Sequence, residues 1–331
     1  MDEVTDVTTT SGEKVLPEHG SGEDPGERSG TPSPTPAGRE ARREPFVAVL
    51  YLLPALVVFG VFIFWPLVKS ILLSVQGTDI LGNPSGFVGL VNYTRLFSDP
   101  DFLQVLWVTF AFTILTVIPS IAIALLIALL LQSRIKGVRF FRTAFALPFA
   151  FSVATASVIF GVLFNPASGV LNGILNTFGI DKVQWLTNPD LALWSVSGAT
   201  VWMQIGYNLL VLSAGLGALP EDVLEAARLD GASGLRLQRS IVMPLLTPQL
   251  FFLVVVGTIH SLQSFGQIKI LTVGGPEDRT TTLVYSIYEQ AFANNNSNYG
   301  YASAQAMVLL VIVLIITALQ FGVLERRVFY R

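Results

Sequence analysis

Long apolar segments recur along the chain from Phe46 onward and dominate its pattern. The hydrocarbon core of a bilayer is about 30 Å thick, so a helix needs about 20 apolar residues to cross it. Six segments reach this length, and none carries a charge near its centre, where insertion is costly. They are residues 47–75, 102–131, 143–164, 191–216, 248–271 and 301–324. The pattern predicts an all-α polytopic membrane protein with six transmembrane helices.

Composition supports the same class. Of 331 residues, 52% are hydrophobic and only 13% are charged, with a mean hydropathy of +0.61. A soluble domain carries roughly 25% charged residues, so the two soluble domains that the length would allow are excluded. The chain has no cysteine, which excludes a disulfide framework, a thiolate zinc site and a cysteine nucleophile.

The first 45 residues differ sharply from the rest. Residues 1–45 are rich in Pro, Gly, Ser, Thr and Glu, with ten acidic and five basic side chains. Such a segment has too little apolar surface to offset its ordering entropy, so it is predicted to be a disordered acidic tail. It does not begin with the short basic stretch, followed directly by an apolar stretch, that is typical of a secretory signal. The remaining domain, 46–331, has a net charge near zero and no basic face for nucleic acid.

The distribution of Lys and Arg predicts the orientation in the membrane. With a cytoplasmic N-terminus and six spans, 15 basic residues fall on the cytoplasmic side and 5 on the outer side. This asymmetry satisfies the positive-inside rule. Both termini are therefore predicted to be cytoplasmic.

One predicted cytoplasmic connection, residues 219–248, has sequence signals of ordered helical structure. Pro220 suits the start of a short helix, and acidic residues follow it in the first turn, where the helix dipole favours them. Gly231 is placed to end this helix in a left-handed conformation. Ser233 then starts a second short helix, which is expected to break before Pro244. The loop is predicted to be a helix–turn–helix.

The spacing within this loop resembles the EAA loop of bacterial ABC import permeases. That pattern reads Glu-Ala-Ala, three residues, Gly, nine residues, Ile, one residue, Leu-Pro. Met243 replaces the Leu, a change that conserves volume. The matching positions are Glu225, Ala226, Ala227, Gly231, Ile241 and Pro244.

The resemblance extends over most of residues 46–331. Segments 139–152, 164–175, 271–292 and 301–316 are similar to the maltose and glycerol-3-phosphate type of carbohydrate permease. The C-terminal LQFGVLERRVFYR is most similar to the glycerol-3-phosphate or glycerophosphodiester branch. The resemblance implies a type I ABC importer permease fold in the bacterial plasma (inner) membrane.

The same resemblance implies a set of partners. A second homologous permease would pair with this chain, two ATPase subunits would lie beneath it, and an extracytoplasmic solute-binding protein would dock outside. The EAA loop would contact the ATPases, which use ATP and Mg. This chain contains no GxxxxGK[ST] phosphate loop, so it is expected to hydrolyse no ATP and to bind no cofactor itself.

Polar residues within two predicted spans are candidates for the solute pathway. In the resembling family, the solute contacts lie on the spans that flank the EAA loop. Hydroxyls and amides suit a sugar or polyol, although such residues also join membrane helices by hydrogen bonds. The candidates are Gln204, Tyr207, Asn208, Thr258, Ser261 and Ser264.

The resemblance favours sn-glycerol-3-phosphate or a glycerophosphodiester as the solute, and a di- or oligosaccharide such as trehalose or maltose is the alternative. No Lys or Arg lies in the middle of a span, so Lys269 and Arg279 near an outer loop are the steering charges considered. A secondary transporter or channel would usually carry ionisable residues in its spans, where this chain has His260 alone. No catalytic constellation supports an enzyme.

Overall fold

The computed structural model describes residues 44–79, 82–132, 137–293 and 297–325. Its contacts divide the chain into two units, Met1–Val58 and Phe59–Arg331. Regular structure in the described part is helical apart from one antiparallel pair of strands, β1 (Gln76–Thr78) and β2 (Pro84–Phe87). This confirms the predicted all-α class. Residues 1–43 of the predicted tail lie outside the described residues.

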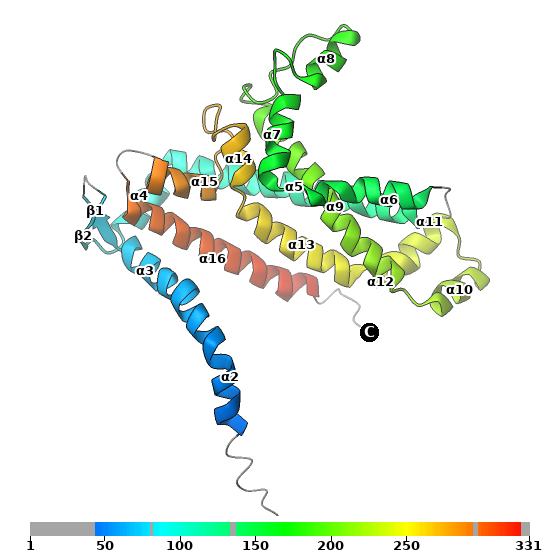
Figure 1. Ribbon diagram of the computed structural model, residues 1–331, viewed down its shortest axis with the longest axis horizontal. Helices are drawn as coiled ribbons and strands as arrows, with labels where there is room; N and C mark the ends of the chain where they lie inside the picture. The colour runs from blue at the N-terminus through cyan, green and yellow to red at the C-terminus, as the bar shows by residue number, and fades with distance from the viewer. Residues whose placement is uncertain (1–43, 80–81, 133–136, 294–296, 326–331) are drawn as a thin grey trace, which may run out of the picture. The chain divides into compact units, whose positions relative to one another are not determined.

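The helices follow one another with short connections (Figure 1). The first apolar segment contains α2 (Glu44–Phe59), the π-helix η1 (Gly60–Phe64) and α3 (Trp65–Ser74). Then come α4 (Val91–Ser98), α5 (Pro100–Leu131), α6 (Val138–Ala146), the 3-10 helix η2 (Leu147–Ala150), α7 (Val153–Leu163), α8 (Val170–Thr177) and α9 (Ala192–Gly217). The remainder comprises α10 (Glu221–Leu229), α11 (Gly234–Leu237), the π-helix η3 (Gln238–Val242), α12 (Met243–Leu245), α13 (Thr247–Leu262), α14 (Gly266–Leu271), α15 (Leu283–Tyr288), the π-helix η4 (Glu289–Ala293) and α16 (Tyr299–Leu324).

Four helical segments in the described part are long and apolar enough to cross a membrane singly. They are Val49–Ser74, Pro100–Leu131, Ala192–Gly217 and Tyr299–Val323. Two further pairs of helices reach the required length together but are bent. Six spans result when each bent pair is counted as one, which agrees with the number predicted from the apolar segments.

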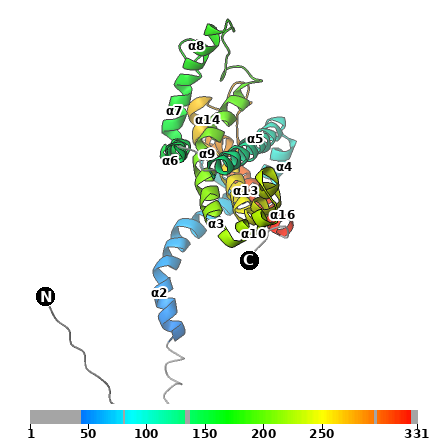
Figure 2. The same cartoon turned by 90° about the vertical axis from the view of Figure 1, so that its right-hand side faces the viewer.

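The third predicted span is wrong as a single helix. The chain turns by 102° between Val138–Ala150 and Val153–Leu163, and Figure 2 shows α7 rising steeply from α6. Pro148 lacks an N–H to donate, and Phe151 and Ser152 are extended rather than helical. The Ser152 hydroxyl then accepts a hydrogen bond from the Thr155 N–H at 3.1 Å, which caps the start of α7. Apolar composition alone gives no sign of this corner.

The fifth predicted span, 248–271, is also interrupted. Helix α13 ends at Leu262, the chain leaves the helical conformation at Phe265, and α14 begins at Gly266. The carbonyl of Ser264 is freed by the break and accepts a hydrogen bond from the Thr282 hydroxyl at 2.8 Å. Backbone within an apolar environment must be satisfied internally, and this distant hydroxyl does so.

The second helix of the 219–248 loop continues past the point where it was expected to break. Segments α11, η3 and α12 run on through Pro244, which occupies the first turn of α12, where its missing N–H costs nothing. The bend of 64° falls at Leu246, immediately before α13. The loop therefore passes directly into the fifth span.

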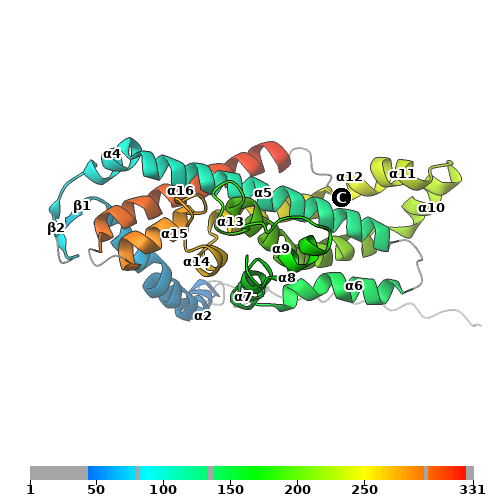
Figure 3. The ribbon, with the colours of Figure 1, turned by 90° about the horizontal axis from the view of Figure 1, so that it is seen from above.

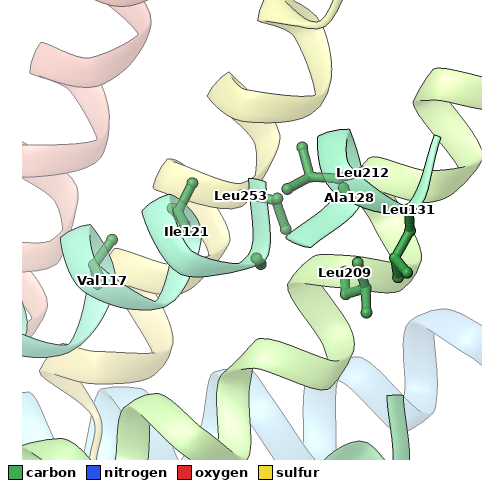
Figure 4. Packing of buried hydrophobic residues seen from close by; sticks show 8 residues of the cluster. Val117, Ile121, Ala128, Leu131, Leu209, Leu212 and Leu253 are labelled. Carbon is green, nitrogen blue, oxygen red and sulfur yellow. The ribbon is translucent and has the colours of Figure 1, made fainter. Parts of the chain in front are cut away.

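Helices α5, α9 and α13 enclose the main core (Figure 4). Helix α5 contributes a stripe that includes Val117, Ile121 and Ala128, spaced so that they lie on one helical face. Leu209 and Leu212 of α9 and Leu253 of α13 fill the space against it. Seen from above, α5, α13 and α16 lie alongside one another (Figure 3).

Large apolar side chains also cover the outside of this bundle. On α5, Ile118 and Leu126 are about as exposed as Leu314 and Leu319 on α16, at close to 60% each. Contiguous apolar surface of this extent is rare on soluble monomers and is the surface that lipid or another membrane subunit covers. The arrangement is that of a multi-pass membrane protein.

Candidate solute cavity and coupling loop

A cavity of about 600 Å³ lies midway along the helical bundle. Its walls come from η2, the start of α7, the middle of α9, the end of α13 and the residues that join α13 to α14. Gln204 stands near the centre of α9, which places the cavity at mid-length. The two bent helices thus both contribute to its wall, and broken helices at the midplane are a usual framework for a solute site.

Four of the six predicted pathway residues line this cavity: Gln204, Tyr207, Asn208 and Ser264. Two of them are joined through Ser120 of α5. The amide of Asn208 donates to the Ser120 hydroxyl at 3.1 Å, and that hydroxyl donates to the Gln204 carbonyl oxygen, also at 3.1 Å. These two hydrogen bonds fix the orientation of both amides on the α9 wall.

The other two predicted residues, Thr258 and Ser261, lie in helix–helix contacts outside the cavity lining. The Thr258 hydroxyl accepts a hydrogen bond from the Gln320 amide of α16 at 3.0 Å. The Ser261 and Thr116 hydroxyls lie 2.7 Å apart, which joins α13 to α5. Although Thr258, Ser261 and Ser264 are equally spaced in sequence, only Ser264 lines the cavity.

Phe149 of η2 contributes an aromatic ring to the cavity wall that the sequence did not single out. The Phe149 and Tyr207 rings lie with centroids 5.7 Å apart at 34°. This closeness depends on Gly206, because a Cβ there would lie 2.8 Å from the Ala146 oxygen and from the Phe149 nitrogen. Pro148 within an apolar run was the available signal for such a corner.

The lining of the cavity is mostly apolar, and its polar groups carry almost no charge. Hydroxyl and amide groups face it, together with His260, Gln263 and Gln267. Among the described residues that line it, there is no Lys, Arg, Asp or Glu. The cavity is therefore suited to hydrogen-bond hydroxyl groups and to stack on the apolar face of a polyol or sugar ring.

The helix–turn–helix loop has the predicted local geometry. Helix α10 ends at Leu229, and Gly231 takes the left-handed conformation with φ of 81°. The Gly231 N–H donates to the Arg228 carbonyl at 3.0 Å, and the Ala232 N–H donates to the Ala227 carbonyl at 2.9 Å. These bonds close the helix as a left-handed glycine cap.

The predicted EAA residues occupy different surroundings. Glu225, Ala226 and Gly231 are exposed, whereas Ala227 is buried. Ile241 and Pro244 are half-buried in η3 and α12. Beside them, two apolar side chains that the sequence analysis did not select stand in the open, Leu229 and Leu235, each 88% exposed.

A bundle of bent helices, a cavity beside the middle of α9 and an ordered helix–turn–helix loop are features of a solute permease. Residues 106–330 match the family model of the binding-protein-dependent transport system inner membrane component, and the chain belongs to this family. It is an inner-membrane, multi-pass permease subunit of an ABC importer, as the loop spacing predicted.

Similar proteins cover nearly the whole chain. The sn-glycerol-3-phosphate transport system permease protein UgpA of Agrobacterium fabrum is 40% identical over 284 residues, which are 85% of this chain and 95% of that protein. The UgpA of Escherichia coli is 35% identical over 298 residues, 89% of this chain and 99% of that protein.

A solved structure shares the fold. One chain of a bacterial alginate ABC transporter, in complex with an alginate pentasaccharide-bound periplasmic protein, superimposes with a TM-score of 0.75 and 22% identity. The match covers 87% of this chain and 96% of that one. The type I permease fold predicted from the sequence is thereby confirmed.

Proposed function

We propose that this permease passes sn-glycerol-3-phosphate or a glycerophosphodiester across the membrane. The relatives that match it over nearly its whole length are named for sn-glycerol-3-phosphate transport. The observation that carries the proposal is the cavity at mid-bundle. Its amides and hydroxyls suit the glycerol hydroxyls, and the Phe149 and Tyr207 rings suit the carbon face.

In this proposal the coupling loop moves the cavity wall through a rigid connection. Segments α11, η3 and α12 pass into α13, and α13 ends one residue before the cavity-lining Gln263. A displacement at α10 would therefore be carried along α13 to the cavity. Two-state rocking of packed helices is the usual basis of alternating access.

The partner at the loop would be an ATPase subunit, which would hydrolyse ATP with the help of Mg, while this chain would bind neither. Leu229 and Leu235 would bury their exposed side chains in a cleft of that subunit. Glu225, Ala226, Ala227 and Gly231 would shape the helix that fits there, with Ile241 and Pro244 supporting the second helix. This places the loop and both termini on the cytoplasmic side, in accord with the excess of Lys and Arg there.

Two further partners complete the proposed importer. A second homologous permease would cover part of the exposed apolar surface of the bundle, and lipid would cover the rest. A solute-binding protein would dock at the end opposite α10 and deliver the solute to the cavity.

A neutral di- or oligosaccharide is the second candidate. It is favoured by one observation, the absence of Lys and Arg among the described residues that line the cavity. A neutral sugar needs hydrogen bonds and stacking only, and both are present there.

Uptake into proteoliposomes tests these proposals. The complex is purified gently from its native membrane, its subunits are identified by mass, and labelled sn-glycerol-3-phosphate is offered with and without ATP. We expect an ATPase, a second permease and ATP-dependent uptake that excess trehalose or maltose leaves unchanged. If the sugars are taken up and sn-glycerol-3-phosphate is not, the sugar is the substrate. If this chain is recovered without an ATPase, the proposal that the loop contacts an ATPase is wrong.

A further inference from the structure

A phosphomonoester needs positive charge that the cavity does not supply. Its second ionisation lies near pH 6, so it carries between one and two negative charges at neutral pH. Among the described cavity-lining residues, His260 is the one with a basic side chain, and no Lys or Arg accompanies it. A cation for the phosphate must therefore come from the surroundings of the cavity.

Lys269 lies one helical turn beyond the cavity rim. It stands on α14, and its backbone N–H donates to the carbonyl of Phe265, the N-cap residue of that helix, at 3.0 Å. Phe265 itself lines the cavity. Figures 1 and 3 show α14 beside the outer end of α13 and next to α15.

The ammonium of Lys269 rests on an aromatic platform. Its Nζ lies 4.7 Å from the ring centroid of Tyr288 and 5.7 Å from that of Tyr285. Phe265 continues the platform towards the cavity, with ring centroids 5.1 Å from Tyr288 and 6.1 Å from Tyr285. Cation–π contact holds an ammonium in place while leaving N–H donors directed away from the rings.

One carboxylate, that of Glu289, acts on this lysine. Glu289 interacts with Lys269 through its charge and accepts a hydrogen bond from the Tyr285 phenol. Asp278 lies near enough to act on Glu289. In the part of the chain that the structure describes, Lys269 makes ring contacts but no ion pair. Its ammonium is thus held in position without being neutralised by direct contact.

Glu289 and Asp278 belong to a separate acid-lined hollow of about 410 Å³. Its lining includes Asp99, Asp101, Glu277, Asp278 and Glu289. An anionic solute is repelled from the acid-lined hollow and attracted to Lys269.

We propose that Lys269, held on the Tyr285 and Tyr288 rings, forms an outer phosphate subsite that makes this permease select phosphorylated polyols. The inference rests on the proposed function, because it assigns the phosphate group of that solute. Lys269 binds the phosphate oxygens while the glycerol end extends past Phe265 into the cavity. Specificity then comes from this charge, and the cavity supplies contacts that any polyol can use.

Charge-neutralising variants of the whole importer complex test the subsite. Uptake of labelled sn-glycerol-3-phosphate by proteoliposomes is measured for wild type, Lys269→Gln, Lys269→Arg and Glu289→Gln, with ATPase stimulation by the loaded binding protein as a second readout. Lys182→Gln is the matched control, because Lys182 is an exposed lysine of another outer segment. Expected results are at least tenfold higher KM in Lys269→Gln, recovery in Lys269→Arg, lower KM in Glu289→Gln and no change in Lys182→Gln, with ATPase stimulation retained throughout.

Each other outcome is decisive. Unchanged KM in Lys269→Gln, with normal wild-type uptake, overturns the subsite and leaves the proposed function standing. Equal loss in Lys269→Gln and Lys269→Arg together with lost ATPase stimulation shows a structural role and also overturns it. Absence of sn-glycerol-3-phosphate uptake in the wild type, with sugar uptake present, overturns both proposals.

Discussion

The hydroxyls of Thr116 and Ser261 lie 2.7 Å apart in the middle of the bundle. Both residues are fully buried, and Thr116 also donates to the Phe112 carbonyl in its own helix. The contact joins α5 to α13 at the level of the cavity without facing it. Thr116 and Ser261 therefore hold the helices together, whereas other residues line the cavity and would contact the solute.

Ser261→Ala should weaken the bundle slightly and leave solute handling intact. Hydrogen bonds between membrane helices contribute about 0.6 kcal/mol on average, so we expect a small fall in the thermal midpoint of the purified complex. The KM for uptake should equal that of the wild type.

Gln204→Leu provides the contrast, because Gln204 lines the cavity and accepts a hydrogen bond from Ser120. Its KM should rise several-fold. A KM effect in Ser261→Ala as large as that in Gln204→Leu would contradict the separation of the two roles.

Residue spacing alone could not predict which of these polar residues line the cavity and which join helices. Thr258, Ser261 and Ser264 were grouped because three-residue steps put them on neighbouring positions of one helix face. The structure divides them among α16, α5 and the cavity. Which neighbour a helix face meets depends on the packing of segments distant in sequence, and a single helix does not encode it.

Gly206→Ala should disturb the cavity wall. The added Cβ would lie 2.8 Å from the Ala146 oxygen and Phe149 nitrogen, so η2 must move away from α9. Overpacking of this kind costs about 1–3 kcal/mol. Thermal unfolding and uptake of the purified complex should both be impaired.

Gly198→Ala is the matched control on the same helix, since a Cβ there meets nothing within 4 Å. It should leave both measurements unchanged. Equal behaviour of the two variants would show that the η2–α9 contact does not shape the cavity.

Hydrophobic length predicted the straight spans well and the bent ones poorly. The predicted 102–131 and 191–216 correspond to α5 (Pro100–Leu131) and α9 (Ala192–Gly217). The 102° corner near Pro148 and the break after Leu262 both fall inside apolar segments. The mean hydropathy of a segment depends on its composition alone. The break after Leu262 is stabilised by the hydroxyl of Thr282, which lies outside that segment. The end of α10 at Gly231 was predictable because a left-handed glycine cap is a local feature, whereas the continuation of the second helix through Pro244 was not predicted.

Leu229→Asp with Leu235→Asp should detach the proposed ATPase without unfolding the permease. Both side chains are 88% exposed, so the folded chain loses almost no packing. Burying one leucine contributes about 1.5–3 kcal/mol, so losing two should lower recovery of the ATPase by more than tenfold. Co-purification followed by mass analysis measures this.

Phe87→Asp is the control for the previous variant. Phe87 lies on β2 and is 79% exposed, so the change has similar chemistry at a site remote in sequence from the coupling loop. ATPase recovery should be unaffected. Undiminished recovery in the double leucine variant would exclude these leucines as the contact.

Glu289→Gln should stabilise the protein at neutral pH. Burial raises the pKa of Glu289 above its ordinary value of 4.5, although the hydrogen bond from Tyr285 opposes the shift. The folded state therefore holds the proton more tightly, so stability contributed by the neutral carboxyl is present below pH 4.5 and is lost as pH rises through the raised pKa. Thermal midpoints of the two proteins should converge at low pH and separate towards neutrality. A wild type more stable than the variant at neutral pH would reverse this sign.

The backbone conformation of Gly231 in the 219–248 loop should determine how efficiently ATP hydrolysis drives uptake. Its φ of 81° lies in the left-handed region, where a side chain costs about 1–2 kcal/mol and Asn is tolerated better than a β-branched residue. No neighbouring atom lies within 4 Å of a Cβ built there, so a substitution acts on backbone conformation alone. Gly231→Val should break the glycine cap, change the angle between α10 and α11 and lower the uptake per ATP hydrolysed, whereas Gly231→Asn should retain most of it. Parallel measurement of uptake and ATP hydrolysis in proteoliposomes gives this ratio. Equal ratios for Val, Asn and wild type would show that the turn joins the two helices without transmitting motion.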